Sequence, residues 1–307
     1  MKSTNFITFF LATFFMVLSS DLFAYTQPQI INGVYQISNA DELYWFAEYV
    51  NNGNTNINAV LTNDITINQN VLNKDGSLNQ TDAATFTQWT PINGFAGVFD
   101  GNGHTISGLY DNGIVLYAGL FGIPTNGTIK NLGLVDFFIK IDEQLTSTQI
   151  GPISSWISMN GSVENCYAQG TVESKGSIGG IAGVNYGNIS NCYSCCSLSG
   201  TDRIGNICIT NYGKIENCYG NSDYCTAAPV YENIDDGEFT NCTNYPSSTL
   251  CSGDLPDGFS EDIWFGGKIY TNGDYVFPGF TEPEPDIVAQ VVWTEDDKTL
   301  TFYYGEQ

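Results

Sequence analysis

The feature that most constrains this chain is a short phrase that recurs at a nearly fixed interval. An aliphatic residue, a polar residue and then Asn-Cys-Tyr stand at 163–167, 189–193 and 215–219, with a weaker copy at 239–243. The cysteines of these four copies are separated by 26, 26 and 24 residues. A second phrase, Ile-Gly at 150, 178 and 204, moves with the first. Two phrases at one period indicate a supersecondary unit stacked on copies of itself.

The repeat is typical of β-structure. Each unit holds short alternating runs broken by Gly and Asn, which form turns and disfavour helices. No repeat window has apolar residues at the spacing of an amphipathic helix. A unit of this length fits three short strands and three turns, with a rise of about 4.8 Å per coil. We therefore expect an all-β fold, a parallel β-helix in which each coil buries its apolar face against its neighbours.

Stacking predicts ladders of identical side chains. Residues at one phase of the repeat lie about 4.8 Å apart in successive coils, close enough for side chains to contact one another. An amide ladder at a corner would satisfy backbone groups of the turn, and small buried thiols would stack beside it. The predicted amide ladder contains Asn131, Asn165, Asn191, Asn217 and Asn241, the thiol ladder Cys166, Cys192 and Cys218, and an aromatic row Tyr167, Tyr193 and Tyr219.

The N-terminus predicts export. Lys2 precedes an apolar run from Phe6 to Leu18, and a small residue, Ala24, stands at a plausible cleavage point. We interpret residues 1–24 as a signal peptide, and no later segment is apolar enough to predict a transmembrane helix. The protein is expected to be secreted or held at a bacterial cell surface by means that the sequence does not identify.

The net charge of the chain limits the class of molecule that it can bind. With 33 Asp and Glu against 9 Lys and Arg, the net charge is −24, which disfavours nucleic acid because phosphate binding needs clustered basic residues.

All nine cysteines lie between 166 and 251. Free buried thiols are the favoured state, since three recur at one phase. Disulfides are the alternative, among Cys195, Cys196, Cys208, Cys225, Cys242 and Cys251.

The stretch 181–193, Ile-Ala-Gly-Val-Asn-Tyr-Gly-Asn-Ile-Ser-Asn-Cys-Tyr, resembles the GLUG repeat of bacterial cell-surface and adhesin-like proteins. The upstream segments 35–43, 61–65, 89–92 and 99–109 resemble the region that commonly precedes such repeats. The resemblance covers about residues 33 to 250. It implies a right-handed β-helix and a surface or adhesion role, and it implies no catalytic residue.

The organisation of the chain follows from these segments. The stretch 40–51 predicts a helix with an apolar stripe, with Asp41 as its cap, which would close the N-terminal end of the solenoid. Residues 282–285 form a Glu-Pro linker before a predicted hairpin. The predicted parts are a signal peptide (1–24), an N-terminal cap region (25–92), β-helix repeats (93–250), a closing segment (251–281), and a linker with an incomplete β module (282–307).

Catalytic and metal-binding residues are weakly indicated. A polysaccharide lyase or hydrolase on the same scaffold would need paired carboxylates or an acid beside a base. The candidates are Asp100, Asp111, Asp136 and Asp142 with Lys130 and Lys140, and they share no phase of the repeat. We interpret His104 as a turn residue, because no catalytic partner accompanies it in sequence. Asp235, Asp236 and Glu238 form a short acidic turn, a weak calcium candidate without the spacing of a twelve-residue loop.

The sequence therefore favours a non-catalytic protein that binds an extracellular glycan or protein through a repetitive face. If Tyr167, Tyr193 and Tyr219 face outward, they form an aromatic strip suited to sugar rings; the alternative is a packed corner beneath a loop. An enzyme on this scaffold and a structural spacer of a larger surface protein are the other hypotheses.

Overall fold

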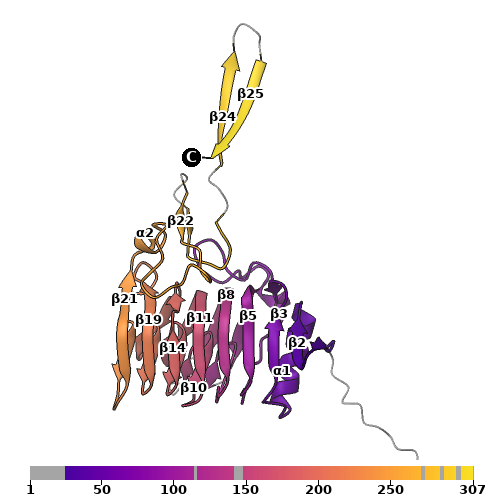
Figure 1. Cartoon of the computed structure of the whole chain (residues 1–307), viewed down its shortest axis with the longest axis vertical. Helices are drawn as coiled ribbons and strands as arrows, with labels where there is room; N and C mark the ends of the chain where they lie inside the picture. The colour runs from indigo at the N-terminus through magenta and orange to yellow at the C-terminus, as the bar shows by residue number, and fades with distance from the viewer. Residues whose placement is uncertain are drawn as a thin grey trace, which may run out of the picture.

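The computed structural model describes residues 25–113, 116–141, 148–270 and 274–283 in full, and the backbone of 287–294 and 299–306. The predicted signal peptide lies outside these residues. The protein is mostly β, and its strands form parallel sheets (Figure 1). The largest sheet contains β1 (Gln29–Ile31), β2 (Val34–Ile37), β3 (Asn58–Leu61), β4 (Ile65–Thr66), β5 (Val98–Ser107), β6 (Tyr110–Gly113), β8 (Thr128–Ile141), β11 (Ser162–Ser174), β14 (Asn188–Ser190), β15 (Tyr193–Ser194), β16 (Ser197–Gly200), β19 (Lys214–Asn221) and β21 (Glu238–Tyr245).

Two smaller parallel sheets take the other strands of each unit. One contains β10 (Ser154–Ile157), β13 (Ala182–Asn185), β18 (Cys208–Asn211) and β20 (Val230–Asn233). The other contains β7 (Tyr117–Ala118), β9 (Gln149–Ile150), β12 (Ser177–Gly179) and β17 (Ile204–Gly205). From β9 to β19 the chain thus visits the three sheets in turn and returns to each one strand further along.

The strand register reproduces the sequence period. Ile189 pairs with Val163 on one side and with Ile215 on the other, each 26 residues away, and Ile215 pairs with Phe239 after 24 residues. Ile178 pairs with Ile150 and Ile204 in the same way. The aliphatic residues of both recurring phrases are buried in one continuous core, except for Ile204, which is half-buried. Equivalent positions of successive units face the same interior.

The N-terminal helix α1 (Ala40–Asn51) lies at the first end of the stack (Figure 1). Its buried stripe includes Leu43, Phe46 and Val50, and Phe46 contacts Phe99 at 5.7 Å between ring centroids. The cap is Asn39, not Asp41. Asn39 has extended backbone dihedrals and its side chain accepts a hydrogen bond from the Glu42 N–H, whereas Asp41 lies inside the first turn.

Two segments lie over the same side of the stack, the upper side in Figure 1. The loop 67–97 contains the short 3₁₀ turn Ala83–Thr85 and is held near its start by hydrogen bonds from the N–H groups of Val71 and Leu72 to Asp136. The segment 246–283, which we call the strap, contains α2 (Ser247–Leu250) and the small hairpin of β22 (Lys268–Ile269) and β23 (Tyr275–Val276). Beyond it, β24 (Ile287–Thr294) and β25 (Thr299–Glu306) pair antiparallel, as the sequence predicts.

Candidate functional site

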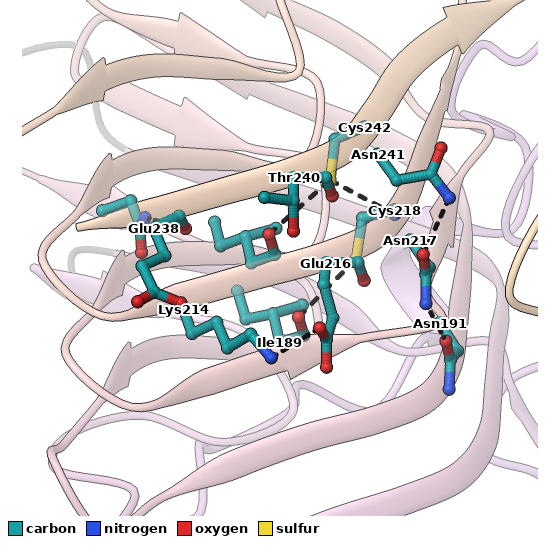
Figure 2. Close-up of polar contacts among 12 residues, drawn as sticks. Ile189, Asn191, Lys214, Glu216, Asn217, Cys218, Glu238, Thr240, Asn241 and Cys242 are labelled. Atoms are coloured by element: carbon teal, nitrogen blue, oxygen red, sulfur yellow. Dashed lines mark hydrogen bonds and ion pairs between the residues drawn. The ribbon is translucent and has the colours of Figure 1, made fainter.

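The asparagines at 131, 165, 191, 217 and 241 form a continuous ladder along one corner. The amide nitrogen of Asn191 donates to the carbonyl oxygen of Asn165 at 3.2 Å, and Asn217 donates to Asn191 at 3.1 Å. Figure 2 shows the ladder continuing from Asn217 to Asn241, whose bond is 2.8 Å. All five residues have φ near +50°, a conformation that Asn adopts more readily than most residues. These side chains hold the corner together.

The thiols of the predicted ladder are buried beside the asparagines. Cys166, Cys192 and Cys218 are fully buried, and the backbone N–H of Cys166 contacts the sulfur of Cys192 at 3.4 Å. Burial raises the pKa of the Cys166 and Cys218 thiols well above its ordinary value. All nine cysteines are free. The structure therefore has free thiols and not the disulfides that the sequence offered as the alternative.

The predicted tyrosine row is buried and does not form an outward strip. Tyr167, Tyr193 and Tyr219 are 8%, 1% and 0% exposed. The Tyr193 hydroxyl donates to the Pro278 carbonyl, and the Tyr219 hydroxyl donates to that of Asp257 at 2.7 Å. The rings face outward from the sheet, but the strap covers them with Phe259, Trp264 and Phe280. The packed corner is therefore correct and the outward binding strip is wrong.

A second aromatic row, which sequence reasoning missed, lies on another corner. Tyr186 stacks on Tyr212 with centroids 4.4 Å apart and planes at 0°, and Trp156 stacks on Tyr186 at 5.4 Å. The two tyrosines are 26 residues apart and each precedes the glycine of its repeat, which was the available signal. All three side chains are partly exposed. Because the rings cover one another's faces, this row presents edges and hydroxyls to solvent.

The hollowed part of the surface lies between the loop 67–97 and the strap. One hollow of about 510 Å³ is bounded by the loop residues 72–76 and floored by strand residues that include Gln169, Thr171 and Ser197. A second hollow of about 610 Å³ lies between Gln169 and the strap residues 275–283. Gln169 lines both hollows, so they adjoin. We call them together the strap groove.

An aromatic platform joins the two halves of the strap groove. Tyr224 lines the first half and is 48% exposed, and Tyr275 lines the second and is 45% exposed. Phe277 lies between them, at 6.2 Å from Tyr224 and 6.4 Å from Tyr275 between ring centroids. Unlike the stacked rows, these two tyrosines leave much of their surface open to a ligand.

The strap groove is acidic. Its lining contains Asp64, Asp75, Asp136, Asp223 and Glu282 against a single cation, Lys74. Some of these acids have structural partners: Asp223 accepts from the N–H of Ser247, and this bond lowers the pKa of the carboxyl. The charge of the walls disfavours anionic ligands.

A further hollow of about 770 Å³ lies on the other side of the loop residues around Asn73. Its floor is the outer face of β6, β8 and β11, where Asn112, Lys140 and Glu173 are in register. Lys140 and Glu173 form an ion pair of 2.9 Å. Their pairing leaves little net charge on this floor.

The carboxylates considered for catalysis serve other purposes. Asp100 pairs with Lys130 at 3.2 Å and accepts a bond from Asn131, and Asp136 accepts the two N–H groups of the loop 67–97. Asp111 is buried, with Gln88 donating to it at 2.8 Å. Asp142 lies outside the described residues.

The remaining sequence candidates are spread over strands and a turn, and the prediction that His104 is a turn residue is wrong, because His104 lies within β5. His104 contacts Asp64 at 3.3 Å. Asp235 and Asp236 are exposed in the turn from β20 to β21, and Glu238 is exposed at the start of β21. Over the described part of the chain, no group of three or more His, Cys, Asp or Glu is arranged to hold a metal ion. Within the same residues, no helix has the length and apolar character needed to cross a membrane.

Comparison with known proteins gives one similarity in sequence and one in structure. The chain resembles part of halomucin from Haloquadratum walsbyi. The two are 29% identical over an alignment of 147 residues that covers 41% of this chain and 2% of halomucin. The solved structure is that of a proposed immunoglobulin A1 protease from Bacteroides ovatus, with a TM-score of 0.48 and 17% identity over 82% of this chain and 95% of that chain. No family model matches.

Proposed function

We propose that this protein is a secreted or surface-exposed, non-catalytic binding protein that takes a neutral glycan in the strap groove. The proposal includes a right-handed parallel β-helix built from GLUG-type repeats. Support for that fold comes from three sheets in which the parallel strands from β9 onward follow one another after 22 to 28 residues. Support for export comes from the charged and apolar N-terminal sequence.

The observation that carries the binding proposal is the half-exposed platform of Tyr224 and Tyr275 between two adjoining hollows. Aromatic rings bind the apolar C–H faces of sugars, and neighbouring amides and hydroxyls orient the polar edges. Gln169, Thr171 and Ser197 supply such groups on the groove floor. The acidic walls favour neutral sugars over uronates and sulfated sugars.

The enzyme hypothesis has less support. A lyase or glycosidase needs an acid and a base, or two carboxyls, that face one substrate. In the strap groove, Asp136 and Asp223 are engaged with backbone N–H groups of the two covering segments. These bonds suit carboxylates that fasten the loop 67–97 and the strap. A structural spacer remains a hypothesis that the binding experiment below separates from a receptor.

The test is a glycan array that carries neutral, uronate-containing and sulfated polysaccharides, probed with residues 25–307 with and without calcium. We expect saturable binding to neutral glycans, lost in a Tyr224→Ala, Tyr275→Ala double variant. The matched control is Tyr231→Ala, since Tyr231 is 53% exposed on β20 and does not line the strap groove. Absence of binding would favour the spacer. Release of unsaturated sugar products would establish a lyase.

A further inference from the structure

The two ends of the stack differ. At the N-terminal end, α1 buries an apolar stripe against the core, and β1 pairs antiparallel with β2 as an added outer strand. At the other end, β21 pairs with β19 and β20 pairs with β18. Among the described residues, β20 and β21 have no strand partner on their outer sides. Backbone N–H and C=O groups on such an edge are free to pair with another strand.

The strap does not cover this end. Along β21, every residue from Glu238 to Asn241 is exposed, and along β20 so are the residues 231–233. Two large side chains are open to solvent there, Phe239 at 38% and Tyr231 at 53%. Figure 1 shows β21 as the last strand of the stack, with α2 on the upper side. The end is therefore an uncovered edge of two parallel sheets with apolar side chains exposed on it.

The asparagine ladder also ends at β21, where one side-chain hydrogen-bond acceptor is unused. Asn241 donates to Asn217, and among the described residues no group donates to the Asn241 carbonyl oxygen. In each earlier coil that oxygen accepts from the next asparagine, as Asn217 accepts from Asn241 (Figure 2). A strand added outside β21 would find both a backbone edge and an open amide acceptor.

Charge decides what kind of strand fits. The end carries four exposed acids, Glu232, Asp235, Asp236 and Glu238. Two cations of the preceding coil approach them: Arg203 lies 3.5 Å from Glu232, and Lys214 is in register with Glu238. Asp235 and Asp236 leave the end with a net negative charge.

This charge disfavours self-association. Two copies that met through this end would bring the same acids together, and like charges across an interface oppose binding. Stacking onto the other end of a second copy is opposed by α1 and β1. The hairpin of β24 and β25 is also a poor occupant, because the sequence between its two strands contains three acids, Glu295, Asp296 and Asp297.

We propose that the open end formed by β20 and β21 is a docking site for an extended strand of a different protein, one that carries Lys or Arg side chains opposite Asp235, Asp236 and Glu238. The strand adds to the edge through backbone hydrogen bonds, and its basic side chains select it. An aliphatic residue of the strand would cover Phe239, as Ile215 does from the inner side.

The register of β19 on β21 gives the design of a probe. Lys214 and Ile215 lie opposite Glu238 and Phe239. A fluorescent peptide of residues 213–221, with Glu216→Lys and Cys218→Ser, presents the same strand pattern with added positive charge. The control peptide replaces both lysines with glutamate. Binding is measured by fluorescence anisotropy, and the site is mapped by hydrogen exchange of the full chain.

The basic peptide should bind and should slow amide exchange in residues 239–243. An Asp235→Asn, Asp236→Asn, Glu238→Gln variant should bind it about tenfold more weakly, and added salt should weaken binding to the parent chain. Asn tolerates the left-handed backbone at 235, where φ is +54°, so this variant is expected to fold. Tyr224→Ala with Tyr275→Ala should leave peptide binding unchanged, which separates this site from the strap groove.

Three results would overturn the proposal. The first is absence of binding by the basic peptide, or equal binding by the acidic control. The second is protection from exchange that lies outside β20 and β21. The third is a dimer of the parent chain at micromolar concentration whose interface protects β21, since this would make a second copy the occupant.

Discussion

At the scale of single residues, position in the repeat decides what each side chain does. Asn191 donates to Asn165 and accepts from Asn217, while its backbone has φ of +52°. The same residue type therefore satisfies two requirements of the corner, a hydrogen-bonding amide and tolerance of left-handed backbone. The ladder could be predicted from the spacing of the asparagines, because equivalent residues of a stacked repeat must meet, but the left-handed backbone could not, since spacing does not determine a dihedral angle.

Asn191→Ala is expected to destabilise the protein by about 2–3 kcal/mol, from two lost hydrogen bonds and the cost of alanine at positive φ. Asn191→Gly relieves the backbone cost and should lose about 1 kcal/mol less. Asn188→Ala is the control, because Asn188 is exposed. The measurement is urea unfolding of the four proteins. Equal stability of the Ala and Gly variants would show that the backbone conformation carries none of the effect.

Asp111 makes stability depend on pH. Burial raises its pKa from 3.8 to about 7, and the bond from Gln88 only partly opposes this. Its Oδ2 has no hydrogen-bond partner. Because the folded pKa is the higher one, ionisation opposes folding. Below about pH 3.8 the group is protonated in both states and does not oppose folding. Between about pH 3.8 and 7 the free energy of unfolding falls as the pH rises. Above about pH 7 this group lowers it no further.

Asp111→Asn should therefore stabilise the protein at pH 8 relative to the parent, by no more than about 4 kcal/mol for a shift of this size. The two proteins should approach each other in stability near pH 4. Thermal unfolding from pH 4 to pH 8 checks this. A stability difference that does not change with pH would mean that the carboxyl is ionised at no cost in the folded protein.

At the scale of elements, sequence reasoning succeeded where contacts repeat and failed where they are unique. The strand register follows from the period of the recurring phrases, and α1 follows from its apolar stripe. The sequence left the burial of Tyr193 undecided, because it depends on Trp264 and Phe259, about 70 residues further along the chain in no repeat. The strap groove was missed for the same reason: its walls come from two non-repeating segments, 67–97 and 246–283.

Trp264 anchors the strap. It is 1% exposed and contacts Tyr167 and Tyr193, with ring centroids about 6 Å away. Trp264→Ala should cost about 3–5 kcal/mol in local stability and detach the strap while the repeats stay folded. We expect faster proteolysis within 246–283 and loss of near-ultraviolet circular dichroism, with little change in the far ultraviolet. Phe265→Ala is the control, since Phe265 is 41% exposed. An unchanged cleavage rate would show that other contacts hold the strap.

At the scale of the whole molecule, the repeats form the support, and the non-repeating segments provide the walls of the proposed binding groove. The core runs through all three sheets, and the loop 67–97 and the strap lie on one side of it. The acidic composition predicts that anionic partners are disfavoured, and the acidic lining of the strap groove extends this prediction to the candidate site. In this account the strap does two things: it buries the tyrosine row and supplies Tyr275 to the platform.

The most direct measurement is calorimetric titration of a neutral oligosaccharide, taken from the glycans bound on the array, into the parent chain, Tyr275→Ala and Tyr231→Ala. Loss of one stacking ring should weaken binding by about tenfold in Tyr275→Ala, and Tyr231→Ala should match the parent. The recovered sugar should be intact after prolonged incubation. Equal affinity of Tyr275→Ala and the parent, or cleavage of the sugar, would contradict a non-catalytic glycan receptor built on the strap groove.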